Sequence, residues 1–219
     1  MADKFRKKET GMDIEITMLM VGAIQTNCYI VNRKGSTDCI VIDPGDEAEK
    51  IASHLEKKGL SNQGILLTHG HFDHIMGVSK LQSLAGGTLY AYEGEKELLA
   101  DPGLNVSYMV NEETALEAEV LLRDGQTLEI AGMDFTVIHT PGHTTGSCCY
   151  YLEQEKILFS GDTIFMESVG RTDFPTGNGR QLLESIRSRV LILPPEVQIY
   201  PGHGPETSVA YEKQNNPYA

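Results

Sequence analysis

The sequence lacks several features that would each point to a particular class of protein. No apolar run approaches the roughly 18 residues that span a bilayer, and the basic N-terminal stretch MADKFRKKETGMD has no apolar signal core after it. The chain has only 18 basic residues against 31 acidic ones, a formal net charge of −13. Because broad nucleic-acid binding requires a basic face, we expect neither a nucleic-acid nor a membrane partner.

Cysteine is also scarce. The four cysteines, at positions 28, 39, 148 and 149, form no CxxC pair, and a chain of 219 residues does not need disulfides. Cys148 and Cys149 are neighbours on a predicted strand, so their side chains point to opposite faces and are poor joint ligands. We therefore predict reduced, mostly buried thiols in a cytoplasmic protein.

What the chain does contain is a set of alternating and apolar segments with helical segments between them. Predicted strands cover residues 14–21, 27–32, 39–43, 64–68, 88–92, 128–130, 133–138, 147–152, 156–160 and a last one from 197. Predicted helices cover residues 47–59, 77–87 and 180–193. Two strand-and-helix halves with a shared seam favour one α/β domain over residues 12–219, preceded by a basic arm at residues 1–11.

Three of the seven histidines lie within six residues of the stretch LLTHGHFDHIMG, directly after a predicted strand. From the composition of this chain, the pattern H-x-H-x-D-H arises by chance in roughly a few of ten thousand such chains. His69 and His71 alternate after the strand and therefore reach one metal together. Asp73 and His74 lie where the chain turns towards a helix. Four ligands at this spacing predict two nearby metal positions.

Further candidate ligands follow other predicted strands: His143 in HTPGHTTGS, Asp162 in LFSGDT and His203 in IYPGHGP. Strand ends collect at one edge of a sheet, so we expect these residues to join the first group. Imidazole and carboxylate donors fit zinc best, and iron and manganese also. Between His139 and His143 we prefer His143, because the glycine-bearing turns around it let the backbone approach a metal.

Asp43 ends a predicted strand, directly before Pro-Gly. Two roles are open for it at this point. It is either a turn residue or a carboxylate that orients a metal ligand.

The four blocks THGHFDH, PGHTTGS, SGDTIF and YPGHGPET resemble, in this order, the signature of the metallo-β-lactamase superfamily. The resemblance implies an α/β fold, a four-layer αββα sandwich of two mixed β-sheets with helices outside. The implied ligands of a first metal are His69, His71 and His143. Those of a second metal are Asp73, His74 and His203, with Asp162 bridging both.

Within the superfamily, GRTDFPTGN and the ending PGHGPETSVAYEKQNNPY resemble short, single-domain relatives of glyoxalase II, the hydroxyacylglutathione hydrolases. This implies a monomer or homodimer that hydrolyses a small anionic thioester such as S-lactoylglutathione, by attack of a hydroxide bridging two divalent metals. Asp73, which would orient the hydroxide, and His74 are the expected catalytic residues.

Two residues are candidates for substrate binding. The longer glyoxalase II enzymes hold glutathione with a lysine and a tyrosine, and the nearest residues here are Arg171 and Phe174. Arg171 pairs either with a substrate carboxylate or, internally, with Asp173.

The block GRTDF also resembles the iron-dependent persulfide dioxygenases, which hold one iron with the equivalents of His69, His143 and Asp162. This alternative predicts one iron per chain and consumption of oxygen. The additional presence of Asp73, His74 and His203 favours the hydrolase. A third alternative is a non-catalytic metal-binding or redox-partner domain. We expect it less, because such relatives usually carry an extra flavin domain, for which this sequence has no room.

Overall fold

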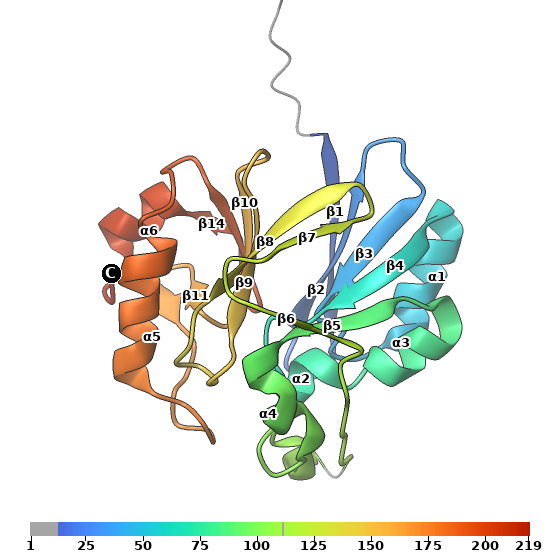
Figure 1. Cartoon of the computed structure of the whole chain (residues 1–219), viewed down its shortest axis with the longest axis horizontal. Helices are drawn as coiled ribbons and strands as arrows, with labels where there is room; N and C mark the ends of the chain where they lie inside the picture. Colours follow the sequence, from blue (N-terminus) through green and yellow to red (C-terminus); the bar gives the residue numbers. More distant parts are fainter. Residues whose placement is uncertain (1–12, 111) are drawn as a thin grey trace, which may run out of the picture.

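The computed structural model describes residues 13–110 and 112–219, so the predicted basic arm at residues 1–11 lies outside the described residues. Two six-stranded sheets pack face to face in the centre of the molecule (Figure 1). Helices α1 and α3 cover the outer face of one sheet, and helix α5 covers the outer face of the other. The predicted four-layer αββα sandwich is therefore confirmed.

The first sheet has the order β1-β2-β3-β4-β5-β6, antiparallel from β1 to β3 and parallel from β3 to β6. Its strands are β1 (Ile14–Val21), β2 (Thr26–Arg33), β3 (Asp38–Ile42), β4 (Ser61–Leu66), β5 (Thr88–Tyr92) and β6 (Val120–Leu122). The helices in this half are α1 (Ala48–Lys58), α2 (Phe72–Ile75), α3 (Val78–Ala85) and α4 (Lys96–Ala100). Parallel pairing brings the carboxyl ends of β3, β4 and β5 to the same edge.

The second sheet has the order β14-β13-β10-β9-β8-β7 and is also mixed, since only β10 and β13 pair in parallel. Its strands are β7 (Thr127–Ile130), β8 (Met133–His139), β9 (Cys148–Leu152), β10 (Ile157–Gly161), β13 (Gln198–Pro201) and β14 (Thr207–Ser208). A small hairpin joins β11 (Ile164–Phe165) and β12 (Ser168–Val169), and the helices here are α5 (Gly179–Ser185) and α6 (Val209–Asn215).

Two predictions in this half need correction. The helix predicted over residues 180–193 is shorter, because α5 gives way to a π-helical turn at Ile186–Val190, after which Leu191 N–H donates to the carbonyl of Ile186. The strand predicted from residue 197 is not the last element. β14 and α6 follow it, and α6 begins where Ser208 Oγ accepts a hydrogen bond from Tyr211 N–H.

Buried apolar side chains fill three layers between these elements. Between the sheets they include Val31, Ile40, Phe135, Tyr150 and Phe159. Between the first sheet and helices α1 and α3 they include Ile30, Val41, Ile51, Leu55, Ile65 and Leu81. Between the second sheet and α5 they include Cys149, Leu158, Leu182, Ile186 and Ile199. Because helices cover the outer faces at the centre of each sheet, strands such as β3, β9 and β10 are almost entirely buried, and the predicted donors lie beyond the strand ends.

Among the described residues, no helix combines the length and the apolar character needed to cross a bilayer.

Candidate metal centre

The structure brings all seven predicted donors together at the carboxyl ends of strands from both sheets. They are His69, His71, Asp73 and His74 after β4, His143 after β8, Asp162 after β10 and His203 after β13. Within each of three overlapping groups of these residues, donor atoms lie within 4.8 Å of one another. Close approach is possible because Gly202 has no side chain: a Cβ there would lie 2.2 Å from Asp162 Oδ1.

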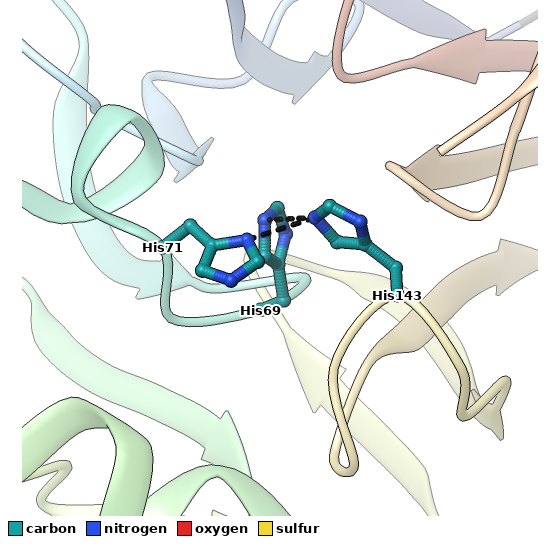
Figure 2. Close-up of side chains that lie close together, drawn as sticks. All are labelled: His69, His71 and His143. Atoms are coloured by element: carbon teal, nitrogen blue, oxygen red, sulfur yellow. Dashed lines mark hydrogen bonds between the residues drawn. The ribbon is translucent and has the colours of Figure 1, made fainter. Parts of the chain in front are cut away.

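The first group consists of His69, His71 and His143, whose rings face one another across the seam between the sheets (Figure 2). His143 Nε2 lies 3.1 Å from His69 Nε2 and 2.9 Å from His71 Nδ1. All three side chains are almost fully buried. The group therefore offers three converging imidazole nitrogens in an enclosed position.

The second group consists of Asp73, His74 and His203. Asp73 Oδ2 lies 3.1 Å from His203 Nε2 and 3.6 Å from His74 Nε2. Asp162 stands between the two groups: its Oδ1 lies 3.4 Å from His74 Nε2, and its Oδ2 lies 3.6 Å from both His143 Nε2 and His203 Nε2. One carboxylate thus contacts both groups, as a bridging ligand would.

Asp43 connects two of these histidines from behind. Its Oδ1 accepts a hydrogen bond from Thr68 N–H (2.8 Å), and its Oδ2 accepts from Thr68 Oγ1 (2.6 Å) and lies 3.0 Å from His74 Nδ1. The single proton of the Thr68 hydroxyl is used in the hydrogen bond to Asp43. The hydroxyl oxygen therefore accepts a hydrogen bond from His69 Nδ1, at 3.2 Å. Asp43 therefore places the Nδ1 proton of both rings away from the cluster, and each Nε2 lone pair points into it.

His143 is oriented in the same way by the main chain, since its Nδ1 donates to the carbonyl oxygen of Arg171 at 2.7 Å. Its Nε2 lone pair then lies 2.9 Å from His71 Nδ1. Burial lowers the pKa of His71 to about 3, so two neutral rings meet there. His71 Nε2, His74 Nε2 and Asp162 Oδ1 are buried without a hydrogen-bond partner among the described residues.

The pKa shifts of the donor histidines also indicate a metal site. Burial lowers the pKa of His69 and His143, which keeps their nitrogens neutral and able to bind a metal. Burial also acts to lower the pKa of His74, but Asp73, Asp162 and Asp43 raise it well above its ordinary value. Carboxylates that raise the pKa of a buried imidazole stabilise positive charge at that place, and they would stabilise a metal cation in the same way. The donor set, the unpartnered atoms and the electrostatics all fit divalent cations.

Comparison with known proteins gives the family. A family model described as the metallo-beta-lactamase superfamily matches residues 21–203. The chain belongs to the metallo-β-lactamase superfamily. Two bacterial relatives cover almost the whole chain. The probable metallo-hydrolase YqgX of Bacillus subtilis is 39% identical over 90% of this chain and 94% of its own. The hydroxyacylglutathione hydrolase GloC of Haemophilus influenzae is 33% identical over 94% of this chain and 98% of its own.

Solved structures of the superfamily agree. The BLEG-1 B3 metallo-beta-lactamase superposes with a TM-score of 0.89 at 37% identity, covering 93% of this chain and 99% of that one. The protein TTHA1623, in a di-iron-bound form, superposes with a TM-score of 0.81 at 33% identity, covering 93% of this chain and 100% of that one. The resemblance to the metallo-β-lactamase superfamily and to glyoxalase II-like proteins is therefore confirmed.

Two residues that support this metallo-β-lactamase centre were not singled out from the sequence. Thr68 joins Asp43 to His69, and the only signal was its position directly before the first histidine. Glu95, fully buried beside the centre, accepts hydrogen bonds from Gly70 N–H (2.8 Å), Thr144 Oγ1 (2.6 Å) and Gly146 N–H (2.7 Å). Glu95 therefore connects the loop of His69 and His71 to the loop of His143. Nothing in the sequence signalled this role, because the strand before Glu95 has an ordinary composition.

The structure also resolves the surroundings of three other candidates. His139 is not in the donor groups: its ring stacks on Tyr92 at 4.3 Å, and its Nε2 lies 2.9 Å from the carbonyl oxygen of Thr145. Arg171 forms the internal alternative, a two-pronged pair with Asp173 at 2.7 and 2.8 Å. Its guanidinium lies 3.7 Å from the ring centre of Phe174, which contacts His71 edge-on.

Proposed function

We propose that this member of the superfamily is a hydrolase of thioesters that binds two divalent metal ions, zinc or iron. The first ion would be held by His69, His71 and His143, the second by Asp73, His74 and His203, with Asp162 between them. The observation that carries the proposal is the presence of two donor groups that share one carboxylate. The relative named as a hydroxyacylglutathione hydrolase supports the substrate class.

When bound at such a site, divalent ions lower the pKa of water and polarise a carbonyl oxygen. The protein groups then have orienting roles. Asp73 lines the cavity in front of the centre, and its Oδ2 accepts a hydrogen bond from Thr26 Oγ1 at 3.2 Å. Held in this way, the carboxylate would accept a hydrogen bond from the attacking water or hydroxide and orient it. A thiolate leaves readily because thiols ionise near pH 8.5. The site therefore needs no strong general acid.

The test is release of free thiol from S-lactoylglutathione, with oxygen excluded and the protein loaded with zinc or with iron. We expect release by the wild type and its loss, together with loss of bound metal, in His71→Ala. His54→Ala is the matched control, because His54 lies on α1 and belongs to none of the donor groups. Full metal content and full activity in His71→Ala would show that the donors are wrongly assigned.

Metal stoichiometry separates the hydrolase from the persulfide dioxygenase. The hydrolase needs both groups, so His203→Ala should reduce bound metal from two ions per chain to about one and reduce thiol release at least about 100-fold. The dioxygenase would contain one iron whether or not His203 is present. One iron per chain in the wild type, with oxygen consumed when glutathione persulfide is added, would support the alternative.

A further inference from the structure

A cavity of about 560 Å³ opens directly in front of the metal centre, and its wall away from the donors is largely apolar. The apolar lining residues are Ile24, Phe72, Met109, Val110, Phe165, Val169 and Phe174. Five ligand residues, His71, Asp73, His143, Asp162 and His203, line the same cavity. A group attached to a carbonyl at the centre can therefore extend along this wall.

The rim of this wall exposes large apolar side chains to water. Ile24 is 51% exposed, Met109 56% and Val110 41%. They come from two separate segments, the β1–β2 turn and the 3₁₀ turn Ser107–Val110, yet they meet at one cavity. Large apolar side chains gathered at the mouth of a cavity are typical of a surface that an apolar ligand covers.

A second cavity, of about 190 Å³, adjoins the first behind this rim. The two share Ile24, Phe72, Asp73 and Val110 as lining residues. The second cavity adds Val21, Ala23 and Met76, and its charged lining residues are all acidic: Asp46, Asp73 and Glu112. A negatively charged group that reached this second cavity would meet carboxylates.

Arg171, the cationic side chain at the rim of the first cavity, does not reverse this preference for an uncharged group. Among the described residues, no lysine lines either cavity, and the arginine that does is Arg171. The guanidinium of Arg171 donates two hydrogen bonds to the carboxylate of Asp173, which offsets its positive charge. The flat face of the guanidinium lies against the ring of Phe174. The hydrogen bond from Arg171 lowers the pKa of Asp173 to about 2, so the pair is charged at neutral pH.

From the apolar rim, the acidic second cavity and the paired arginine, we infer that the thioester substrate carries an uncharged, apolar chain of several carbons beside the reacting carbonyl. This inference rests on the proposed hydrolase function and narrows it. On this inference Arg171 does not hold a carboxylate on the acyl side of the substrate. It also identifies Met109 and Val110 as residues that determine specificity.

Binding of uncleavable probes tests the inference without depending on activity. The probes are S-methyl-, S-hexyl- and S-(5-carboxypentyl)-N-acetylcysteamine, thioethers with an uncharged head, titrated calorimetrically into zinc-loaded protein. We expect the hexyl probe to bind at least about tenfold more tightly than the methyl probe, because buried methylenes add affinity. The carboxylated probe should bind at least about tenfold more weakly than the hexyl probe. Equal affinities, or preference for the carboxylate, would overturn the inference.

Two variants locate the effect. Met109→Ala should reduce the preference for hexyl over methyl by about threefold or more. Met18→Ala is the matched control, since Met18 is also exposed but lines neither cavity, and the preference should be unchanged. Asp173→Asn removes the partner of Arg171 and should increase the affinity of the carboxylated probe selectively. An unchanged preference in Met109→Ala would show that the chain binds elsewhere.

A kinetic comparison separates this inference from the proposed function. If both hold, zinc- or iron-loaded protein cleaves S-hexanoylglutathione with a kcat/KM at least about tenfold above that for S-lactoylglutathione. Cleavage of S-lactoylglutathione alone would overturn the inference and leave the hydrolase standing. Cleavage of neither substrate would overturn the proposed hydrolase function. The affinities of the three probes would then still show whether the cavity wall prefers an apolar group to a charged one.

Discussion

At the scale of single residues, Asp43 orients two histidines of the donor groups although it belongs to none of these groups. Its carboxylate contacts His74 directly and His69 through the Thr68 hydroxyl. In Asp43→Asn the side-chain amide would present N–H groups to partners that already carry protons. We expect metal affinity to fall about 10- to 100-fold, as for other groups that orient metal-binding histidines. Competition with a chelating dye measures it.

The matched control is Asp38→Asn, at the exposed beginning of the same strand, β3. It should leave metal affinity within experimental error of the wild type. Thr68→Val keeps the shape of the side chain but breaks the link to His69, so it should weaken binding as well. If Asp43→Asn bound metal with the affinity of the wild type, Asp43 would be a turn residue and would not orient the metal ligands.

Glu95 acts at the same scale on stability. Replacing it with alanine leaves two buried backbone N–H groups, of Gly70 and Gly146, and the Thr144 hydroxyl without their acceptor. We expect Glu95→Ala to lower the free energy of unfolding by roughly 3 kcal/mol or more, measured by urea denaturation, because unpaired buried donors are costly. Glu97→Ala, an exposed glutamate on α4, should change it by less than about 0.5 kcal/mol.

At the scale of elements, Asp124 joins the second sheet to the helices outside it. It precedes β7, and its Oδ1 accepts from His139 N–H at the end of β8 (2.9 Å) and from Arg189 in the π-helical turn (2.6 Å). Partial burial acts to raise the pKa of Asp124, but the hydrogen bonds from Arg189 and His139 lower it below its ordinary value. The folded state therefore holds this carboxylate ionised at a lower pH than the unfolded chain does.

A depressed carboxyl pKa gives this contact a defined pH dependence. Its stabilisation is complete above the unfolded pKa of about 3.9 and is lost as the pH falls through the lower folded value. Asp124→Asn should therefore have a lower urea midpoint than the wild type at pH 6, and the gap should narrow as the pH falls below the unfolded pKa of about 3.9. Asp134→Asn, an exposed aspartate on β8, should show no such gap. A gap that widens in acid would contradict the assignment.

The elements also show how far the sequence could lead. Strands that are largely apolar and buried, such as β3 and β9, and the helix that ends at Gly59 were predictable from local pattern alone. So was the gathering of the donors, because the segments that carry them all come after predicted strands. Glu95, Met109 and Val110 were not, because they lie in the segment between β5 and β6, where local pattern gives no period. Their roles depend on which distant loops they meet.

At the scale of the whole molecule, the metal centre joins the two sheets. His69, His71, Asp73 and His74 come from the first sheet, and His143, Asp162 and His203 come from the second. Each proposed metal position takes donors from both sheets. A bound ion therefore acts as a cross-link that the unfolded chain cannot form, and its binding free energy adds to the stability of the fold.

Removal of metal should consequently lower the melting temperature. Free metal at 1,000 times its Kd stabilises a fold by about 4 kcal/mol. This figure is for one site, and a chain of this size gains about 2–4 °C per kcal/mol, so we expect chelation to lower Tm by roughly 10 °C for each ion removed. The same comparison in His71→Ala should show a smaller difference, and His54→Ala should keep the full one. A wild-type Tm that chelation leaves unchanged would mean that the two sheets are held together without the metal ions.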